Sequence, residues 1–221
     1  MVAMVDAPVT TNRTSLTAGA VAWLVGGVGY LVAEALAAST TNGPYSYTHK
    51  YISALGVPAW TPLANLMNGA FCMQGAMFFI AAVMVCRAVG RRGMTFLVLS
   101  AVTALGNFLV ATVHGGSPLA EGGGMKWHVL GASMAFFAGN AAIVAGSSMV
   151  ARAVDVGWWY RAVSLLIAVA GFIALALLMN YNVWTFKYLP VGLVERAAVY
   201  SIIGWQMFSA VLLLWRPAGC R

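Results

Sequence analysis

Six long apolar runs constrain the fold of this chain more than any other feature of its sequence. A helix rises about 1.5 Å per residue, so about 20 apolar residues cross the roughly 30 Å hydrocarbon layer of a bilayer. The runs are continuous rather than alternating, which favours helices, and helices satisfy their own backbone hydrogen bonds in lipid. We predict an all-α integral membrane protein, a six transmembrane helix bundle, with spans at residues 15–38, 63–85, 94–113, 127–149, 159–179 and 193–215.

The composition agrees with lipid as the solvent for most of the chain. Of the 221 residues, 62% are hydrophobic and 8% are charged, whereas soluble domains carry about 25% charged residues. The net charge is +7, but the positive residues are scattered in ones and twos, so we expect no nucleic-acid partner. The three cysteines form no CxxC pair, which argues against a disulfide framework and a cysteine zinc site.

The distribution of Lys and Arg predicts which way the bundle points, because positively charged short loops stay in the cytoplasm. Eight of the 12 lie on the side of the two termini: Arg13, Arg87, Arg91, Arg92, Arg152, Arg161, Arg216 and Arg221. Four lie on the other, outer side: Lys50, Lys126, Lys187 and Arg196. We therefore predict one membrane domain over residues 15–215 in the cell membrane, with cytoplasmic N- and C-terminal tails at residues 1–14 and 216–221.

Ionisable residues collect in the outer half of the predicted bundle. All three histidines lie there, as do three of the five carboxylates: His49, His114, His128, Glu34, Glu121 and Glu195. Glu34 is about one turn inside the outer end of the first span, and Glu195 is about one turn inside the start of the last. His114 ends the third span and His128 opens the fourth. We expect Glu34, Glu195, His114 and His128 to ring one depth, and we take them as the candidate catalytic residues.

The acids leave more than one interpretation open. An acid inside a span costs about 2.5–3.5 kcal/mol on insertion scales, so such residues usually face a bundle interior or a wet cavity. Glu34 and Glu195 can instead be hydrated near the interface, and Glu195 is favourable at a helix N-terminus. A bond between Arg196 and Glu34 across the bundle is a further alternative, in which both residues are structural.

The histidines allow three interpretations. A histidine beside a partly buried glutamate supplies a proton donor and a proton acceptor for acid–base chemistry. Plain interfacial histidines explain the same pattern. A metal site lacks supporting spacing such as HExxH, so we predict no metal and no cofactor. A nucleophilic serine has no GxSxG motif and would have to be Ser46, Ser53 or Ser117 acting with a glutamate.

The segment after the first predicted span forms a long connection. It runs from Ser39 to Thr61, is rich in Tyr and Ser, and contains Pro44 and Pro58. Residues 51–57 are apolar enough to lie in the membrane interface. We expect this segment to cover the outer mouth of the bundle as a lid.

Several short motifs, taken in order, resemble one family. They are Tyr45-Ser46-Tyr47, Ile52-Ser53-Ala54-Leu55-Gly56-Val57, Asn65-Leu66-Met67-Asn68 with Gly75, His128-Val129-Leu130-Gly131-Ala132, Ala135-Phe136-Phe137 with Gly139-Asn140, and Gly192-Leu193-Val194-Glu195-Arg196 with Tyr200. Together they resemble the bacterial and archaeal membrane family called domain of unknown function 998. The resemblance covers nearly the whole chain and implies a six-helix integral membrane protein without implying a reaction. Ala54 stands where the family often has Asp, whereas His128, Glu195 and Arg196 occupy matching positions.

The first of two hypotheses is a membrane-embedded enzyme that acts on an isoprenoid or another lipid in the outer half of the bundle. Proton-initiated chemistry of the cyclase or isomerase type needs only proton transfer and aromatic faces that stabilise a developing cation. A lipid hydrolase is the next enzymatic choice. The predicted substrate-binding residues are Tyr30, Tyr200, Trp205, Asn140 and Arg196. The expected partners are membrane lipids and a hydrophobic small molecule.

The second hypothesis is a non-catalytic membrane protein that binds lipid, stabilises a complex or passes a small molecule. Many secondary transporters contain internal repeats with matching broken spans. No internal repeat is visible in this sequence, so transport ranks below lipid binding. Convergence of the acids and histidines on one lipid-accessible cavity would favour the enzyme.

Overall fold

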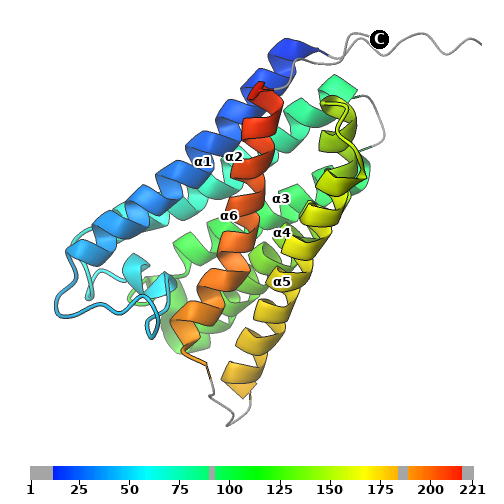
Figure 1. Ribbon diagram of the computed structural model, residues 1–221. Coiled ribbons are helices and arrows are strands. Elements are labelled where there is room, and N and C mark those ends of the chain that lie inside the picture. The colour runs from blue at the N-terminus through cyan, green and yellow to red at the C-terminus, as the bar shows by residue number, and fades with distance from the viewer. Residues whose placement is uncertain (1–11, 90–92, 184–188, 216–221) are drawn as a thin grey trace, which may run out of the picture.

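The computed structural model describes residues 12–89, 93–183 and 189–215. Six long helices account for most of this part of the chain (Figure 1): α1 (Arg13–Ser39), α2 (Ala64–Val89), α3 (Met94–Thr112), α4 (Met125–Ala153), α5 (Trp158–Val183) and α6 (Val191–Trp215). Two short 3-10 helices lie between them, η1 (Ser53–Gly56) and η2 (Pro118–Gly123). Each of the six long helices is long and apolar enough to cross a membrane, which confirms the predicted six-helix bundle.

The helices overlap the predicted spans and run past some of them. Helix α4 is the longest, with 29 residues, and extends beyond its predicted span of residues 127–149 at both ends. Residues 1–11, 90–92, 184–188 and 216–221 lie outside the described part of the chain. Several of the arginines and Lys187, which carry the orientation signal, fall among them, so a cytoplasmic location of both termini stays a prediction.

The helices form an antiparallel bundle in which neighbours in sequence are mostly neighbours in space. Helix α1 packs along α2, α3 packs along α4, and α6 returns to α1. Helix α5 packs against α4 and α6. Arg13 and Trp215 lie at one end of the bundle, and the connection between α1 and α2 lies at the opposite end (Figure 1). We call that connection, residues 40–63, the first loop, and the end that carries it the loop end.

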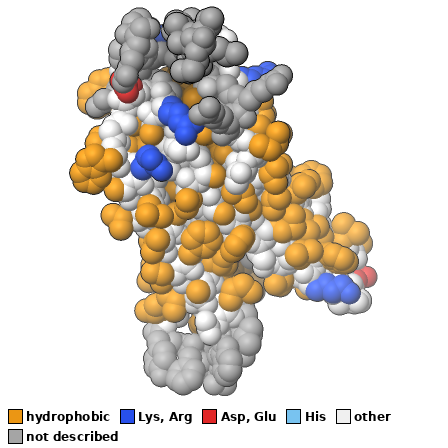
Figure 2. Space-filling view, turned by 90° about the vertical axis from the view of Figure 1, so that its right-hand side faces the viewer, with side chains coloured by type: hydrophobic (Ala, Val, Ile, Leu, Met, Phe, Trp, Pro, Cys, Tyr) orange, Lys and Arg blue, Asp and Glu red, His pale blue; other side chains and the backbone are white. Residues whose placement is uncertain are grey.

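The surface of the bundle matches a protein that lies in lipid. Figure 2 shows hydrophobic side chains covering the middle of one face, with Lys, Arg, Asp and Glu side chains towards its two ends. Large exposed apolar side chains include Leu105, Phe108, Leu166 and Ile173. Such an apolar belt between polar ends is what contact with a hydrocarbon layer requires.

The buried apolar side chains form two main clusters. The cluster away from the loop end includes four packed aromatic rings: Trp23, Phe78, Phe96 and Trp205. The cluster at the loop end includes Tyr30, Phe71 and Ile203 together with Ile52 and Leu55 of the first loop. Ile52 and Leu55 are almost completely buried, so the first loop is part of the core and lies as a lid against the ends of α1, α2 and α6.

Candidate functional site

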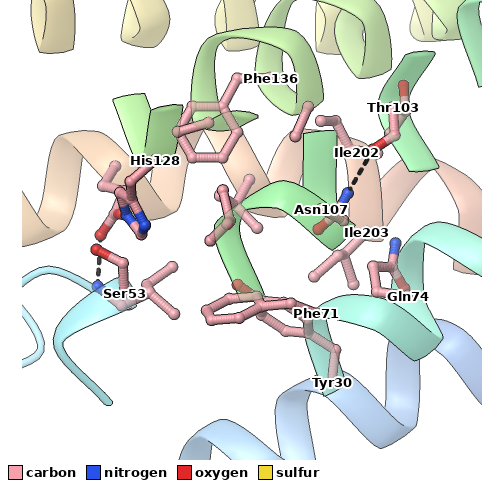
Figure 3. A pocket seen from close by; sticks show the side chains of 16 residues that line it. Tyr30, Ser53, Phe71, Gln74, Thr103, Asn107, His128, Phe136, Ile202 and Ile203 are labelled. Atoms are coloured by element: carbon pink, nitrogen blue, oxygen red, sulfur yellow. Dashed lines mark hydrogen bonds between the residues drawn. The ribbon is translucent and has the colours of Figure 1, made fainter. Parts of the chain in front are cut away.

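A slim pocket extends from the first loop towards the middle of the bundle. Side chains from α1, α2, α3, α4 and α6 line it, together with Ile52 and Ser53 of the first loop. Figure 3 shows His128 and Ser53 at one end, Gln74 and Thr103 at the other, and the rings of Phe71 and Phe136 on opposite sides between them. The cavity volume is about 40 Å³. One water needs about 10–15 Å³ on this measure, so the pocket accepts a few waters or a slim linear chain.

His128, in the first turn of α4, lines the pocket. Its Nδ1 lies 2.7 Å from the carbonyl oxygen of Val113. A carbonyl oxygen only accepts hydrogen bonds, so in the neutral ring Nδ1 carries the proton and Nε2 is the acceptor. The Val113 carbonyl thus fixes the tautomer that makes Nε2 a proton acceptor.

Glu195, in the first turns of α6, lines the same end of the pocket and is 5% exposed. Its Oε2 accepts a hydrogen bond of 2.5 Å from the backbone N–H of Ile52, the N-cap residue of η1. The carboxyl group therefore caps the first turn of η1, whose amides have no partner within the helix. Within the described ranges, no Lys or Arg forms a salt bridge with Glu195.

Glu34 and Arg196 form a buried ion pair between α1 and α6. The Glu34 Oε1 lies 2.8 Å from Nη2 and 2.9 Å from Nε of Arg196. Its Oε2 accepts a hydrogen bond of 2.8 Å from the Tyr200 hydroxyl. The interhelical Glu34–Arg196 bond that the sequence allowed is therefore present, and it uses the guanidinium that lies next to Glu195 in the chain.

Arg196 also holds the first loop in place. Its Nη1 donates to the carbonyl oxygens of Tyr47 and Lys50, and its Nη2 donates to the Tyr45 hydroxyl. Burial raises the pKa of Tyr45 to about 12, so this phenol keeps its proton and donates it to the Tyr51 carbonyl at 3.0 Å. Glu195 and Arg196 are adjacent on α6, and together they clamp the lid from Tyr45 to Ile52.

Replacing Gly192 by Ala is expected to loosen this clamp. A Cβ at Gly192 would collide with the carbonyl oxygen of Lys50 and lie 2.7 Å from that of Tyr47. Helix propensity favours Ala over Gly by about 1 kcal/mol. A net loss of stability in this variant is therefore caused by the collision. We expect chymotryptic cleavage of the first loop in detergent to rise about tenfold, equivalent to about 1.4 kcal/mol of local stability.

Gly204→Ala is the matched control for that experiment. Gly204 lies on the same helix, and a Cβ added there would have no atom within 4 Å. Its substitution should leave the cleavage rate of the first loop unchanged. Equal cleavage rates in the Gly192→Ala variant and the wild type would show that the loop does not lie against α6 this closely.

One protein family matches most of this chain. The model of a family described as protein of unknown function (DUF998) matches residues 11–212. The chain belongs to this family. No curated protein and no solved structure shows significant similarity to this chain.

The motifs that resemble DUF998 contact one another in the structure. The Tyr45–Tyr47 motif and the Ile52–Val57 motif both bond to the Gly192–Arg196 motif through Arg196 and Glu195. Asn68, in the motif on α2, donates from Nδ2 to the carbonyl oxygen of Gly56 at 2.8 Å. The motifs of the first loop, α2 and α6 therefore build the lid and its attachment to the bundle.

The remaining predicted site residues of this DUF998 protein lie at different places. Tyr30 lines the pocket. His114 follows α3 with its Nδ1 3.0 Å from the Gly115 carbonyl oxygen, and it is not among the residues that line the pocket. Asn140 bonds to the carbonyl oxygens of Phe136 and Ala198 and accepts from Ser201, which ties α4 to α6.

Trp205 lies in the aromatic cluster away from the loop end. Its Nε1 donates to the Ser164 hydroxyl at 3.0 Å. Tyr200 bonds to Glu34 beside the ion pair. Across the described ranges, no three His, Cys, Asp or Glu side chains gather as metal ligands would.

The predicted site residues did not include the polar side chains at the far end of the pocket. Gln74, Thr103 and Asn107 line it there. Gln74 lies ten residues into α2, which places an amide about 15 Å along the helix, close to the middle of a span. Polar side chains at that depth are expensive in lipid, and this was the sequence signal that could have identified them.

Proposed function

We propose that this DUF998 protein is an enzyme of the cell membrane that moves a proton on the apolar chain of a lipid-phase substrate. Glu195 is the acid and His128 is the base. The observation that carries the proposal is that both side chains line one mostly apolar pocket. Glu34 does not compete for this role, because its carboxylate is neutralised by Arg196.

The chemistry needs no group beyond these side chains. Glu195 donates a proton to one carbon of a carbon–carbon double bond, and Nε2 of His128 removes a proton from the carbon bonded to the other end of that double bond. The double bond shifts, and the proton returns from His128 to Glu195 directly or through water. Phe71 and Phe136 lie on opposite sides of the pocket (Figure 3), where their faces can stabilise the positive charge that develops on the chain.

The size of the pocket favours one type of this chemistry. Pockets that enclose a drug-sized ligand measure about 300–1,000 Å³, whereas this cavity measures about 40 Å³. A linear isoprenoid or acyl chain fits such a space better than a chain folded for ring closure. Within the predicted cyclase or isomerase class, the geometry therefore supports isomerisation.

A lipid hydrolase is the second candidate. Ser53 lies in the pocket at the same end as His128 (Figure 3), and a serine next to a histidine acceptor can act as a nucleophile. Hydrolysis requires the Ser53 hydroxyl, whereas proton transfer by Glu195 and His128 does not. The Ser53→Ala variant therefore separates the two candidates.

Solvent deuterium provides a test that does not need the substrate in advance. The protein is placed in nanodiscs made from the total lipid of the cells that produce it and is incubated in D₂O. Mass spectrometry then follows deuterium uptake into each lipid. We expect uptake into one unsaturated lipid, and a loss of about 100-fold or more in Glu195→Gln and His128→Gln, since general acid–base groups contribute about 10²–10⁴-fold.

Glu121→Gln and His49→Gln are the matched controls. Both residues are exposed, lie at the loop end and do not line the pocket, so their variants should keep full deuterium uptake. Undiminished uptake in Glu195→Gln would remove that residue from the mechanism. A lipid that copurifies with the wild type but takes up no deuterium would indicate a non-catalytic lipid-binding protein.

A further inference from the structure

Two glutamine side chains form a reciprocal pair in the interior of the bundle. Nε2 of Gln74 donates to Oε1 of Gln206 at 2.6 Å, and Nε2 of Gln206 donates to Oε1 of Gln74 at 3.1 Å. The second N–H of Gln206 donates to the Trp23 carbonyl oxygen at 2.9 Å. Both side chains are buried, so the pair joins α1, α2 and α6 where water is scarce.

The pair leaves one N–H donor of Gln74 without a hydrogen-bond partner among the described residues. A glutamine amide has two N–H donors, and Gln206 uses both. Gln74 uses one, on Gln206. Gln74 lines the pocket and Gln206 does not, so the second N–H of Gln74 lies at the pocket wall, at the end away from His128 (Figure 3).

Asn107 supplies an acceptor at the same end. Its Nδ2 donates to the Thr103 carbonyl oxygen at 2.9 Å, which fixes the orientation of the amide and leaves Oδ1 on the other side. No donor from the described residues reaches that oxygen. Gly75, next to Gln74, packs directly against Asn107, so the donor of Gln74 and the acceptor of Asn107 belong to one small region.

We infer that this inner end of the pocket binds a hydroxyl group, and that the ligand is a hydrophobic alcohol. A hydroxyl both donates and accepts, which matches one N–H of Gln74 and one oxygen of Asn107. A plain hydrocarbon would leave both groups unpaired in an apolar site. The inference rests on the proposed function in one respect, because the same pocket is proposed to hold the substrate. If so, the substrate is a chain that carries a hydroxyl group.

Binding of two matched probes tests the inference without any need for turnover. Tritiated 1-dodecanol and tritiated n-dodecane have the same chain and differ in one hydroxyl. A scintillation proximity assay on the purified full-length protein in detergent measures the affinity of each. We expect the wild type to bind dodecanol at least about tenfold more tightly, the factor that corresponds to about 1.4 kcal/mol.

Asn107→Leu is the decisive variant, because the side-chain bond that Asn107 makes to Thr103 is local to α3. It should bring the ratio of the two affinities close to one. Asn180→Leu is the matched control: Asn180 makes the same local bond, to the Ala176 carbonyl oxygen, on an exposed position of α5. That variant should keep the wild-type ratio, and His128→Gln should keep it as well.

Three outcomes overturn the inference. They are equal or absent binding of the two probes by the wild type, an unchanged ratio in Asn107→Leu, and a ratio lost in His128→Gln instead, which would place the hydroxyl at the other end. Failure of the proposed function is distinguishable from these outcomes. If the proposed function fails but the inference holds, no lipid takes up deuterium, while the protein still prefers dodecanol and loses that preference in Asn107→Leu.

Discussion

Replacing Arg196 by Met is expected to lower the free energy of unfolding by about 3–5 kcal/mol, the cost of leaving a buried partner charge without its counter-ion. Glu34 is 1% exposed, and its carboxylate lies 2.8 Å from the guanidinium. The same substitution removes the donors to Tyr47 and Lys50 in the first loop. For a chain of this size, we expect the midpoint of thermal unfolding in detergent to fall by about 6–20 °C.

Two further variants show whether the charge of Glu34 causes this loss. Arg161→Met removes an exposed arginine from α5 and should change stability by less than about 0.5 kcal/mol. Glu34→Gln combined with Arg196→Met removes both charges and should recover a large part of the stability, since a buried ion pair often adds little over a neutral pair. No recovery in the double variant would mean that the first-loop contacts dominate instead.

The fold was predictable because a single physical constraint controls it. Runs of about 20 apolar residues have few stable alternatives to membrane-spanning helices, and all six appear as long helices. The position of Ser39–Thr61 over one end of the bundle also agrees with the expected lid. What the pattern did not give is the rotation of each helix about its axis, which depends on packing against the others.

Because the sequence pattern does not give the rotation of each helix, it could not decide which partner each acid of the candidate site contacts. Counting residues along the spans placed Glu34 and Glu195 at similar depths, but depth does not say which partner each side chain meets. In the structure Glu34 meets Arg196, whereas Glu195 meets Ile52 and the pocket. The sequence allowed both arrangements for Glu34, and only the packing of α1 against α6 selects one.

Trp205 was a predicted substrate-binding residue, but it lies at a different depth from Glu195 and does not line the pocket. Trp205 lies ten residues after Glu195 on α6, which is about 15 Å further along the helix. It packs with Trp23 and Phe96, whereas Phe71 and Phe136 line the pocket. Which aromatic rings face a cavity follows from how the helices assemble, and a sequence with many aromatic residues in its spans does not contain that information in a local pattern.

The wall of the pocket between α3 and α4 depends on a close contact of two glycines. A Cβ at Gly106 would lie 2.5 Å from the backbone nitrogen of Ala135 and 2.6 Å from the carbonyl oxygen of Gly131. A Cβ at Gly131 would lie 2.9 Å from the carbonyl oxygen of Gly106. The neighbouring atoms are backbone and cannot move like a side chain. Small residues permit such close helix packing in membranes, where dispersion forces drive association.

We therefore expect Gly106→Ala to lower the free energy of unfolding by about 1–3 kcal/mol, the usual cost of overpacking, and Gly106→Leu to lower it further and reduce the yield of folded protein. Gly69→Ala is the matched control, because Gly69 lies in α2 with nothing within 4 Å of an added Cβ. That variant should be neutral or more stable by up to about 1 kcal/mol from helix propensity. Thermal unfolding in detergent measures all three, and a Gly106→Leu variant as stable as the wild type would show that α3 and α4 do not approach this closely.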